Sequence, residues 1–391
     1  MIYLDNAATT KVRREVLDEM LPYFSEYYTN PSSIYSPSRM VSKKVEEARK
    51  LIAGTIGAEA SEIYFTSGGS ESDNWAIKKI MISRMNKGKH MITTKVEHHA
   101  VLESCKYLES LGFEVTYLNV NEDGLIDLNE LESSIREDTI LVSIMAANNE
   151  IGTLMPLKEI GDICKKHKVL FHTDAVQAYG NIPIDVNEMN IDLLSTSAHK
   201  IEGPKGIGFL YVRKGVMITP LISGGMQEKG KRAGTTNAPG IIGFAKAAEL
   251  KFSEIKKNNE YVLNLREHLI DRVLSEIPYV RLNGSRDKRL VGNANFSFQF
   301  IEGEGMLLKL DALGICASSG SACTSGSLDP SHVLLAIGLP HEIAHGSLRL
   351  TMNHENTMEE IDYTVDKLKE VISGLRSMSP LYEDFVKKGS N

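Results

Sequence analysis

The sequence predicts an α/β protein with a large domain, built on a mostly parallel sheet flanked by helices, and a smaller α+β domain. Two observations support this prediction. Short apolar runs alternate with helical patterns between about residues 60 and 215, as strands and crossover helices do in a parallel sheet. After about residue 255 the pattern changes to a long helical stretch, separated strand-like runs and a final amphipathic helix.

The predicted strands of the large domain are, in chain order, EIYFT, HMITTKV, FEVTYLNV, TILVSIM, KVLFHTDA, DLLSTSA and GIGFLYV. Helical stretches such as SESDNWAIKKIM and LKEIGDICKKHK lie between them. We place the large domain at residues 16–255 and the small domain at residues 1–15 and 256–391. Ligands of such sheets bind at the carboxyl ends of the strands, so the residues that follow each run are the first candidates for a site.

The small domain is expected to end in a helix that begins near the segment NTMEE. Asn356 is expected to cap this helix by bonding to amides near Glu359. Its inner face would be formed by apolar residues at helical spacing, namely Ile361, Val365, Leu368 and Ile372.

Composition and charge exclude several classes of function. The 391 residues are 42% hydrophobic and 24% charged, as in an ordinary globular enzyme, and a net charge of −7 argues against nucleic acid as the main ligand. No apolar run approaches membrane-spanning length, and the start, MIYLDNAATT, lacks the regions of a signal peptide. The four cysteines form no CxxC pair and no disulfide pattern. We therefore expect a cytoplasmic protein with reduced thiols.

A glycine-rich turn, SGGSES at residues 67–72, follows the first predicted strand and precedes a helix. Such a turn can bring backbone N–H groups to a phosphate at the helix amino terminus. The turn lacks the Walker lysine and the dinucleotide glycine spacing, so an ordinary tight turn explains it equally well.

Three later strands end in polar residues, Asn149, Asp174 with Gln177, and Ser197 and His199 with Lys200. Pyridoxal phosphate requires a lysine for its Schiff base, a carboxylate that keeps the pyridine nitrogen protonated, and donors to its phosphate and ring oxygen. His98 or His99, after another strand, would lie over the ring and transfer protons. Taken singly, such residues are more often helix caps or solvated charges.

Cys323 lies in the segment SSGSACTSGSLDPSHVLLAIG, among residues too small and polar to pack a core. This composition indicates a loop that exposes a thiol. Such a setting suits a nucleophile that takes up a sulfur atom and passes it on. An ordinary loop cysteine is the alternative.

A zinc hydrolase is a competing interpretation, because HEIAH at residues 341–345 has the H-E-x-x-H spacing. Pro340 and Gly346 limit a helix there to little more than one turn. Leu348 and Thr351 stand where the extended zinc motif needs a glycine and a histidine. We therefore expect no metal site, and a short surface helix that leads into the strand SLRLT.

The chain resembles the cysteine desulfurases of the NifS/IscS type, in the class V aminotransferase group of pyridoxal-phosphate enzymes. The matching strings span nearly its whole length: YLDNAATT, NPSS, FTSGGSESDN, EHHAV, NNEIGT, HTDAVQ, SAHKIEGPKGIG, RAGTTN, SGSACTSG, GSLRL and RSMSPLYED. The resemblance implies fold type I of the pyridoxal-phosphate-dependent transferases. It also implies conversion of L-cysteine to L-alanine, with sulfur transfer to an acceptor protein for iron–sulfur cluster assembly or tRNA thiolation. A selenocysteine lyase or another class V aminotransferase is the alternative.

The resemblance implies a role for each matching position. Lys200 would be the Schiff-base lysine, Cys323 the persulfide-forming nucleophile, and His98, rather than His99, the ring-stacking acid and base. Arg349 would bind the substrate carboxylate with Asn149 assisting. The remaining cofactor contacts would be Asp174 at the pyridine nitrogen, Gln177 and Asn149 near the ring oxygen, and Gly69, Ser70, Ser197 and His199 at the phosphate.

Thr235 of RAGTTN would reach a phosphate across the interface of a homodimer. The SGSAC loop resembles the group that supplies iron–sulfur assembly, with a scaffold protein as the sulfur acceptor. The chain departs from the family pattern at Tyr35, Ser38, Ser70 and Glu202, where histidine, glycine, threonine and an aromatic residue or histidine are common. Ser70 keeps the hydroxyl of threonine, whereas Tyr35 and Glu202 leave activity level and partner choice open, but not the reaction class.

Overall fold

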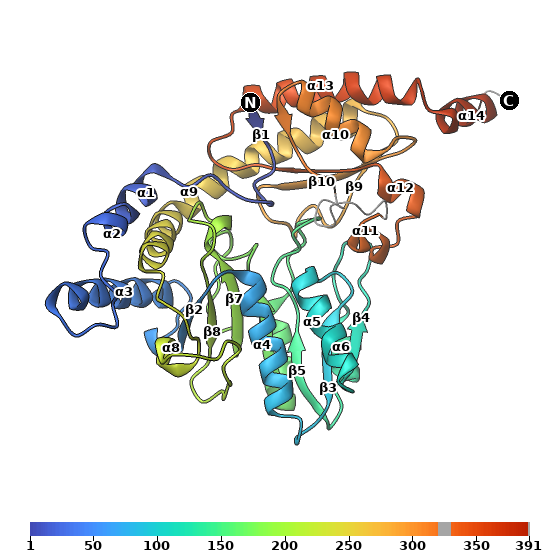
Figure 1. Ribbon diagram of the computed structural model, residues 1–391. Coiled ribbons are helices and arrows are strands. Elements are labelled where there is room, and N and C mark those ends of the chain that lie inside the picture. Colours follow the sequence, from blue (N-terminus) through green and yellow to red (C-terminus); the bar gives the residue numbers. More distant parts are fainter. Residues whose placement is uncertain (320–329, 390–391) are drawn as a thin grey trace.

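The large domain is built on a seven-stranded sheet (Figure 1) in a computed structural model that describes residues 1–319 and 330–389. The strand order is β2 (Ile63–Thr66), β8 (Gly208–Val212), β7 (Leu193–Ser197), β6 (Leu170–Asp174), β5 (Thr139–Ser143), β3 (His90–Thr94) and β4 (Glu114–Leu118). The strands from β7 to β4 are mutually parallel, whereas β8 is antiparallel to both of its neighbours. The mostly parallel sheet predicted from the sequence is confirmed, and all seven apolar runs form strands.

Helices cover both faces of this sheet. The helices of the large domain are α1 (Arg14–Met20), α2 (Pro22–Ser25), α3 (Ser36–Gly54), α4 (Gly69–Ser83), α5 (His99–Ser110), α6 (Leu128–Ser134), α7 (Leu157–His167) and α8 (Gln227–Gly230), with 3-10 turns at η1 (Ala60–Glu62) and η2 (Ala198–Lys200). Alternate residues of one strand enter different cores: Phe209 and Tyr211 pack in one core and Leu210 in the other. Strands buried on both faces need such continuous apolar sequence.

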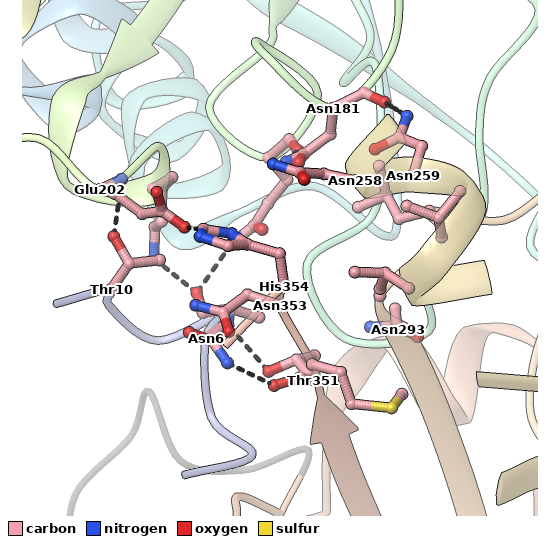
Figure 2. Close-up of a pocket in the computed structure, with 18 of the residues that line it drawn as sticks. Asn6, Thr10, Asn181, Glu202, Asn258, Asn259, Asn293, Thr351, Asn353 and His354 are labelled. Atoms are coloured by element: carbon pink, nitrogen blue, oxygen red, sulfur yellow. Dashed lines mark hydrogen bonds and ion pairs between the residues drawn. The ribbon is translucent and has the colours of Figure 1, made fainter. Parts of the chain in front are cut away.

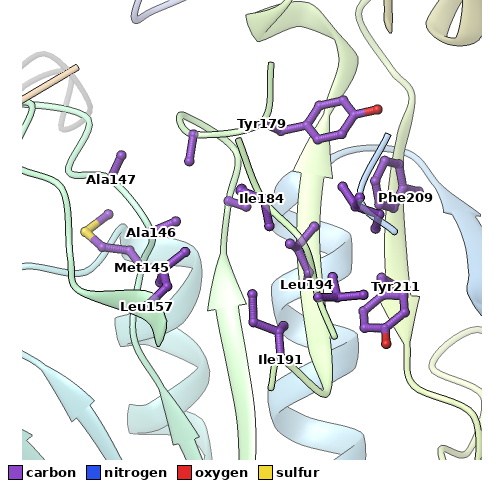
Figure 3. Packing of buried hydrophobic residues seen from close by; sticks show 14 of the residues in the cluster. Met145, Ala146, Ala147, Leu157, Tyr179, Ile184, Ile191, Leu194, Phe209 and Tyr211 are labelled. Carbon is purple, nitrogen blue, oxygen red and sulfur yellow. The ribbon is translucent and has the colours of Figure 1, made fainter. Parts of the chain in front are cut away.

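Figure 3 shows part of the larger of these two cores, where Leu194 and Ile191 pack near Tyr211 and Phe209, on the side of the sheet that also carries Leu157. This packing fixes the strand ends that carry the polar residues of the site.

The small domain contains a three-stranded antiparallel sheet in the order β12 (Ser347–Thr351), β10 (Asn293–Phe298) and β9 (Val280–Leu282). Its helices are α10 (Gly303–Ala312), α11 (His332–Ala336), α12 (His341–His345), α13 (Met358–Arg376) and α14 (Pro380–Gly389). A parallel pair of short strands, β1 (Ile2–Tyr3) and β11 (Ile315–Cys316), attaches the amino terminus to this part of the chain. No helix among the described residues is long and apolar enough to cross a membrane.

Helix α9 (Ala238–Glu276) runs from one domain into the other (Figure 1). Its first part, including Phe244, packs in the core of the large domain, and its second part, including Leu265 and Leu269, packs in the core of the small domain. The domain boundary that we predict at residue 255 therefore falls inside a continuous helix, and the division of the chain at that residue stays a prediction.

The start of α13 differs from the prediction. Thr357, not Asn356, is the N-cap, and it forms a reciprocal capping box with Glu360. Asn356 instead accepts a hydrogen bond from the Asn353 backbone N–H at 2.9 Å and donates to the Tyr3 carbonyl at 3.2 Å. The prediction was wrong by one residue because the Asn356 side chain bonds to a segment that is distant in sequence. The predicted inner face of the helix is buried as expected.

The segment HEIAH forms α12, a helix of five residues that leads into β12, as predicted. Pro340 precedes this helix and Gly346 ends it. The short helix therefore delivers the chain to the strand that carries Arg349.

Candidate active site

The carboxyl ends of the central strands open on one cavity. This cavity brings together all of the predicted site residues except Thr235 and Cys323, namely Gly69, Ser70, His98, Asn149, Asp174, Gln177, Ser197, His199, Lys200 and Arg349. The convergence follows from topology, because parallel strands end at the same edge of a sheet. Their individual roles stay predictions.

Lys200 ends the short turn η2 and reaches the amino-terminal segment. Its Nζ donates hydrogen bonds to the carbonyl oxygens of Ala7 at 2.6 Å and Ala8 at 2.7 Å. The Gln177 side chain also donates to the Ala7 carbonyl, at 2.9 Å. The amino-terminal segment therefore forms one wall of the cavity, and it holds the lysine in place through backbone groups.

Asp174 lies at the end of β6, and one of its carboxylate oxygens accepts the backbone N–H of Val176 at 2.9 Å. Burial raises the pKa of Asp174, whereas the nearby His98 and Lys200 act to lower it. A cationic ring nitrogen in the cavity would favour the ionised carboxylate further. The site thus holds a buried acid suited to a cationic partner.

His98 is the N-cap of α5, where its Nδ1 accepts the backbone N–H of Ala100 at 3.1 Å. It therefore starts a helix and also lines the cavity. Burial lowers the pKa of His98, against the opposing effect of Asp174. Since Nδ1 accepts a hydrogen bond, the proton of the neutral ring lies on Nε2.

The amino terminus of α4 forms another part of the cavity, with Gly69 and Ser70 in its first turn. A Cβ at Gly69 would lie 2.5 Å from a methyl carbon of Val176, so only glycine allows this close approach. The backbone N–H groups of a first helical turn have no partners within the helix. His199 lines the same cavity, and burial lowers its pKa to about 4, which leaves a neutral ring at pH 7. This end of the cavity has the donors that an anion requires.

Arg349 of β12 is buried, and two of its nitrogens are already engaged. Nη1 donates to the Asn149 carbonyl at 2.9 Å, and Nη2 donates to the Asp5 carboxylate at 2.8 Å. The buried Nε forms no hydrogen bond to any residue that the structure describes. A buried donor without a partner is costly, so this edge of the guanidinium suits an incoming carboxylate. Sequence reasoning missed Asp5, because its partner is 344 residues away.

Sequence reasoning also missed Asp73, a buried acid in the wall of the cavity. Asp73 of α4 lines the cavity, and its Oδ1 accepts no hydrogen bond from the described residues, with His172 Nε2 3.6 Å away. Burial and the neighbouring Asp174 raise the pKa of Asp73 well above its ordinary value. A mid-helix aspartate has no sequence signal that separates it from a solvated one.

Thr235 is not among the residues that line this cavity. It lines a separate cavity together with Arg232 and Gly206, so within one chain it does not meet Lys200, and the predicted contact across a dimer stays a prediction. Cys323 lies outside the described residues. Ser318, five residues before it, lines the cavity of Lys200.

The comparisons with known proteins agree with this geometry. The sequence matches the family "Aminotransferase class-V" over residues 2–364. It is 56% identical to "Cysteine desulfurase IscS" of Methanosarcina thermophila over 97% of this chain and 94% of the relative. The chain belongs to the cysteine desulfurase family. Members of this family and of the class V aminotransferases are pyridoxal-phosphate enzymes.

Solved structures confirm the fold of this cysteine desulfurase family member. A "NIFS-LIKE PROTEIN" superimposes with a TM-score of 0.90 at 40% identity, covering 96% of this chain and all of the other. The structure of "SspA in complex with cysteine" superimposes with a TM-score of 0.80 at 38% identity, covering 91% and 100% of the two chains. The predicted fold type I, with its large and small parts, is therefore confirmed.

Glu202, one of the departures from the family pattern, follows Lys200 by two residues and lines a second cavity, together with Thr10 and His354 (Figure 2). Its buried carboxylate lies 3.2 Å from Nδ1 of His354, which follows β12. The pair therefore joins the large domain to the small domain beside the active site. Nothing in the structure explains the exposed Tyr35.

We expect Glu202→Gln to lower the melting temperature by a few degrees at pH 6 and by less at pH 9, where Arg13 and Lys251 still face the carboxylate but His354 is neutral. The hydrogen bond to Glu202 raises the pKa of His354. The ion pair therefore stabilises the fold fully below the pKa of a free histidine, about 6.5, and this contribution is lost as the pH rises through the higher folded value. Thermal unfolding at both pH values measures the difference, with the exposed Glu137→Gln as a matched control. An equal loss at both pH values would contradict the ion pair.

Proposed function

We propose that this protein converts L-cysteine to L-alanine and passes the sulfur, carried as a persulfide on Cys323, to an acceptor protein. The observation that carries the proposal is the meeting of Lys200, Asp174 and Arg349 in one cavity. These groups suit a cofactor aldehyde, a cationic ring nitrogen and an amino-acid carboxylate respectively. The names of the relatives, and the complex of one structurally similar protein with cysteine, support the same reaction.

The residues of the cavity fit pyridoxal phosphate. Lys200 would hold the aldehyde carbon, Asp174 the ring nitrogen, and the amino terminus of α4 with Ser197 and His199 the phosphate. The orphaned Asp73 oxygen beside Asp174 supports a polar ligand at the buried end of this cavity. When bound, pyridoxal phosphate supplies the electron sink that makes the bonds at the substrate α-carbon labile.

The side chains of the protein would perform the remaining steps. Arg349 binds the substrate carboxylate through its Nε edge, which bonds to none of the residues at 1–319 and 330–389, while Asp5 and Asn149 fix the guanidinium plane. Lys200, which would hold the cofactor, would also move protons at the substrate, and His98 would share this task.

The sulfur step is a displacement. The Cys323 thiolate attacks the substrate sulfur, an S–S bond forms and the C–S bond breaks. The electron pair of the broken bond stays on the substrate β-carbon, which takes up a proton and becomes the methyl group of alanine. The two sulfur atoms are oxidised to a persulfide while the β-carbon is reduced to a methyl group, so no external oxidant is needed.

The test of this function is the measurement of alanine and sulfide from L-cysteine in the presence of a thiol. We expect equal amounts of both products and a visible absorbance band from the bound cofactor. Activity that required a keto-acid acceptor would indicate transamination instead, and preference for selenocysteine over cysteine would indicate a lyase. Co-purified acceptor proteins would separate a role in iron–sulfur assembly from one in tRNA thiolation, both of which we place in the cytoplasm.

We propose a homodimer in which Thr235 contributes to the partner's phosphate site. The supporting observation is that the Thr235 cavity lies apart from that of Lys200 within one chain.

We expect Arg349→Lys to raise the KM for L-cysteine by about 10- to 100-fold with a smaller change in kcat. A lysine amine cannot present the planar pair of donors that a carboxylate accepts. Steady-state kinetics of alanine release measures the effect, with Arg14→Lys as a control because Arg14 is an exposed residue of α1. An unchanged KM would show that the substrate carboxylate binds elsewhere.

A further inference from the structure

The segment that contains Cys323 is attached at its amino-terminal side to the backbone of Arg349. The Ser318 N–H donates to the Arg349 carbonyl at 3.2 Å, and the Arg349 N–H donates to the Ser318 carbonyl at 2.6 Å. This antiparallel bridge pairs Ser318 with β12 at Arg349, the residue that is expected to bind the substrate carboxylate.

On the carboxyl-terminal side, the chain is attached through a side chain. The buried Ser331 donates its hydroxyl proton to the Glu150 carboxylate. Its oxygen also accepts the backbone N–H groups of Val333 at 3.1 Å and Leu334 at 3.3 Å, which caps α11. Because the proton goes to Glu150, the oxygen lone pairs are directed to the helix, and one hydroxyl joins α11 to Glu150.

Glu150 is itself held rigidly beside the substrate site. Its backbone carbonyl accepts hydrogen bonds from the side chains of Asn293 and Asn295 of β10, both at 3.1 Å. It directly follows Asn149, whose carbonyl holds the Arg349 guanidinium. The described residues on either side of Cys323, Ser318 and Ser331, therefore bond to Arg349 and Glu150 respectively.

We propose that Glu150 is a positioning residue for the sulfur step, because it anchors the chain at Ser331, eight residues after Cys323. The inference rests on the proposed function, because it assigns Cys323 the attack on the substrate sulfur. Glu150 has no part in the cofactor chemistry, since it does not line the cavity of Lys200.

Glu150 also makes this attachment dependent on pH. Burial raises the pKa of Glu150 to about 7, against the hydrogen bond from Ser331 and the positive charge of Arg349 on β12. The side of β10 contributes only the neutral amides of Asn293 and Asn295. Above pH 7 the carboxylate accepts a charge-assisted hydrogen bond, and below pH 7 this becomes a weaker neutral one. The rate of the sulfur step is thus expected to fall as the pH falls through 7.

The test compares Glu150→Gln, Ser331→Ala and Ser331→Thr in the holoenzyme, with the exposed Glu159→Gln as a matched control. Two rates are measured after mixing with excess L-cysteine: the change of the cofactor spectrum, which reports substrate binding, and the formation of persulfide on Cys323. We expect Glu150→Gln and Ser331→Ala to slow persulfide formation about tenfold at pH 8 and to change the spectral rate less than twofold. Ser331→Thr, which keeps the hydroxyl, and Glu159→Gln are expected to stay near the wild-type rate.

The pH profile is the second measurement. The ratio of the wild-type to the Glu150→Gln rate of persulfide formation is expected to fall from about ten at pH 8 toward one as the pH falls through 7, because ionisation of the Cys323 thiol affects both proteins equally. A ratio that does not change with pH would overturn the proposal, as would equal slowing of both rates, which indicates a merely structural role. A wild-type protein that forms no alanine from cysteine would instead refute the proposed function itself.

Discussion

Lys200→Ala is expected to lower L-cysteine turnover by roughly 10³-fold or more. The substitution removes the amine that would both hold the cofactor and move protons at the substrate. The structure gives the reason for expecting such a large effect. Among the described residues that line this cavity, Lys200 is the lysine, and its amine is already directed by the carbonyls of Ala7 and Ala8. Alanine release from cysteine measures the loss.

A second measurement separates attachment of the cofactor from catalysis. Borohydride reduction of the holoenzyme, followed by peptide mass spectrometry, is expected to find the cofactor on Lys200 in the wild type and on no peptide in the variant. The matched control is Lys205→Ala, since Lys205 lies in the same loop and donates to the Thr10 carbonyl at 3.1 Å without lining the cavity. Recovery of the cofactor on Lys205 or another lysine would show that the assignment of Lys200 is wrong.

Cys323→Ser is expected to abolish persulfide formation and sulfur transfer, again by roughly 10³-fold or more, because a hydroxyl does not ionise to a nucleophile at neutral pH. Binding of cysteine is expected to persist, since the residues that would bind its carboxylate and amine lie in the described cavity. The expected signature is thus an intact spectral response to cysteine with no sulfur on the protein. Absorbance spectra and mass spectrometry after reaction with cysteine test the two halves of this expectation.

The other cysteines provide the controls. Cys105 and Cys164 are buried, and burial raises the pKa of the Cys164 thiol to about 12, so neither supplies a thiolate at neutral pH. Cys316 is only partly buried, and Cys316→Ser is expected to retain persulfide formation. Persulfide recovered on Cys316 in the Cys323→Ser protein would contradict the assignment of the nucleophile.

The sequence predicts this site well where the signal is local. Apolar runs identify the strands, and the polar residues that follow them meet because the strands are parallel, as Asn149, Asp174 and Lys200 do. Arg349 was identified only through the family resemblance, since a strand arginine in an apolar context has no distinguishing pattern of its own.

Contacts between distant segments could not be predicted in this way. Asp5 meets Arg349 and Ser331 meets Glu150 across 344 and 181 residues, and neither partner carries a pattern that indicates the other. The N-cap of α13 was misplaced for the same reason, because Asn356 bonds to Tyr3. Side chains that are fixed by tertiary structure thus remain outside the reach of periodicity and spacing.

The continuous helix α9 has a mechanical consequence. At 39 residues it is about 58 Å long by the rise of an α-helix, and from Ala245 to its end it contains neither glycine nor proline, the usual causes of a kink. It is therefore a rigid helix that belongs to both domains, and not a flexible linker between them. Cutting the chain at residue 255 would leave each core its own part of the helix, but it would remove the continuous helix backbone that joins the two domains. Any closure of the small domain over its substrate must therefore bend or rotate α9 rather than turn about a flexible hinge.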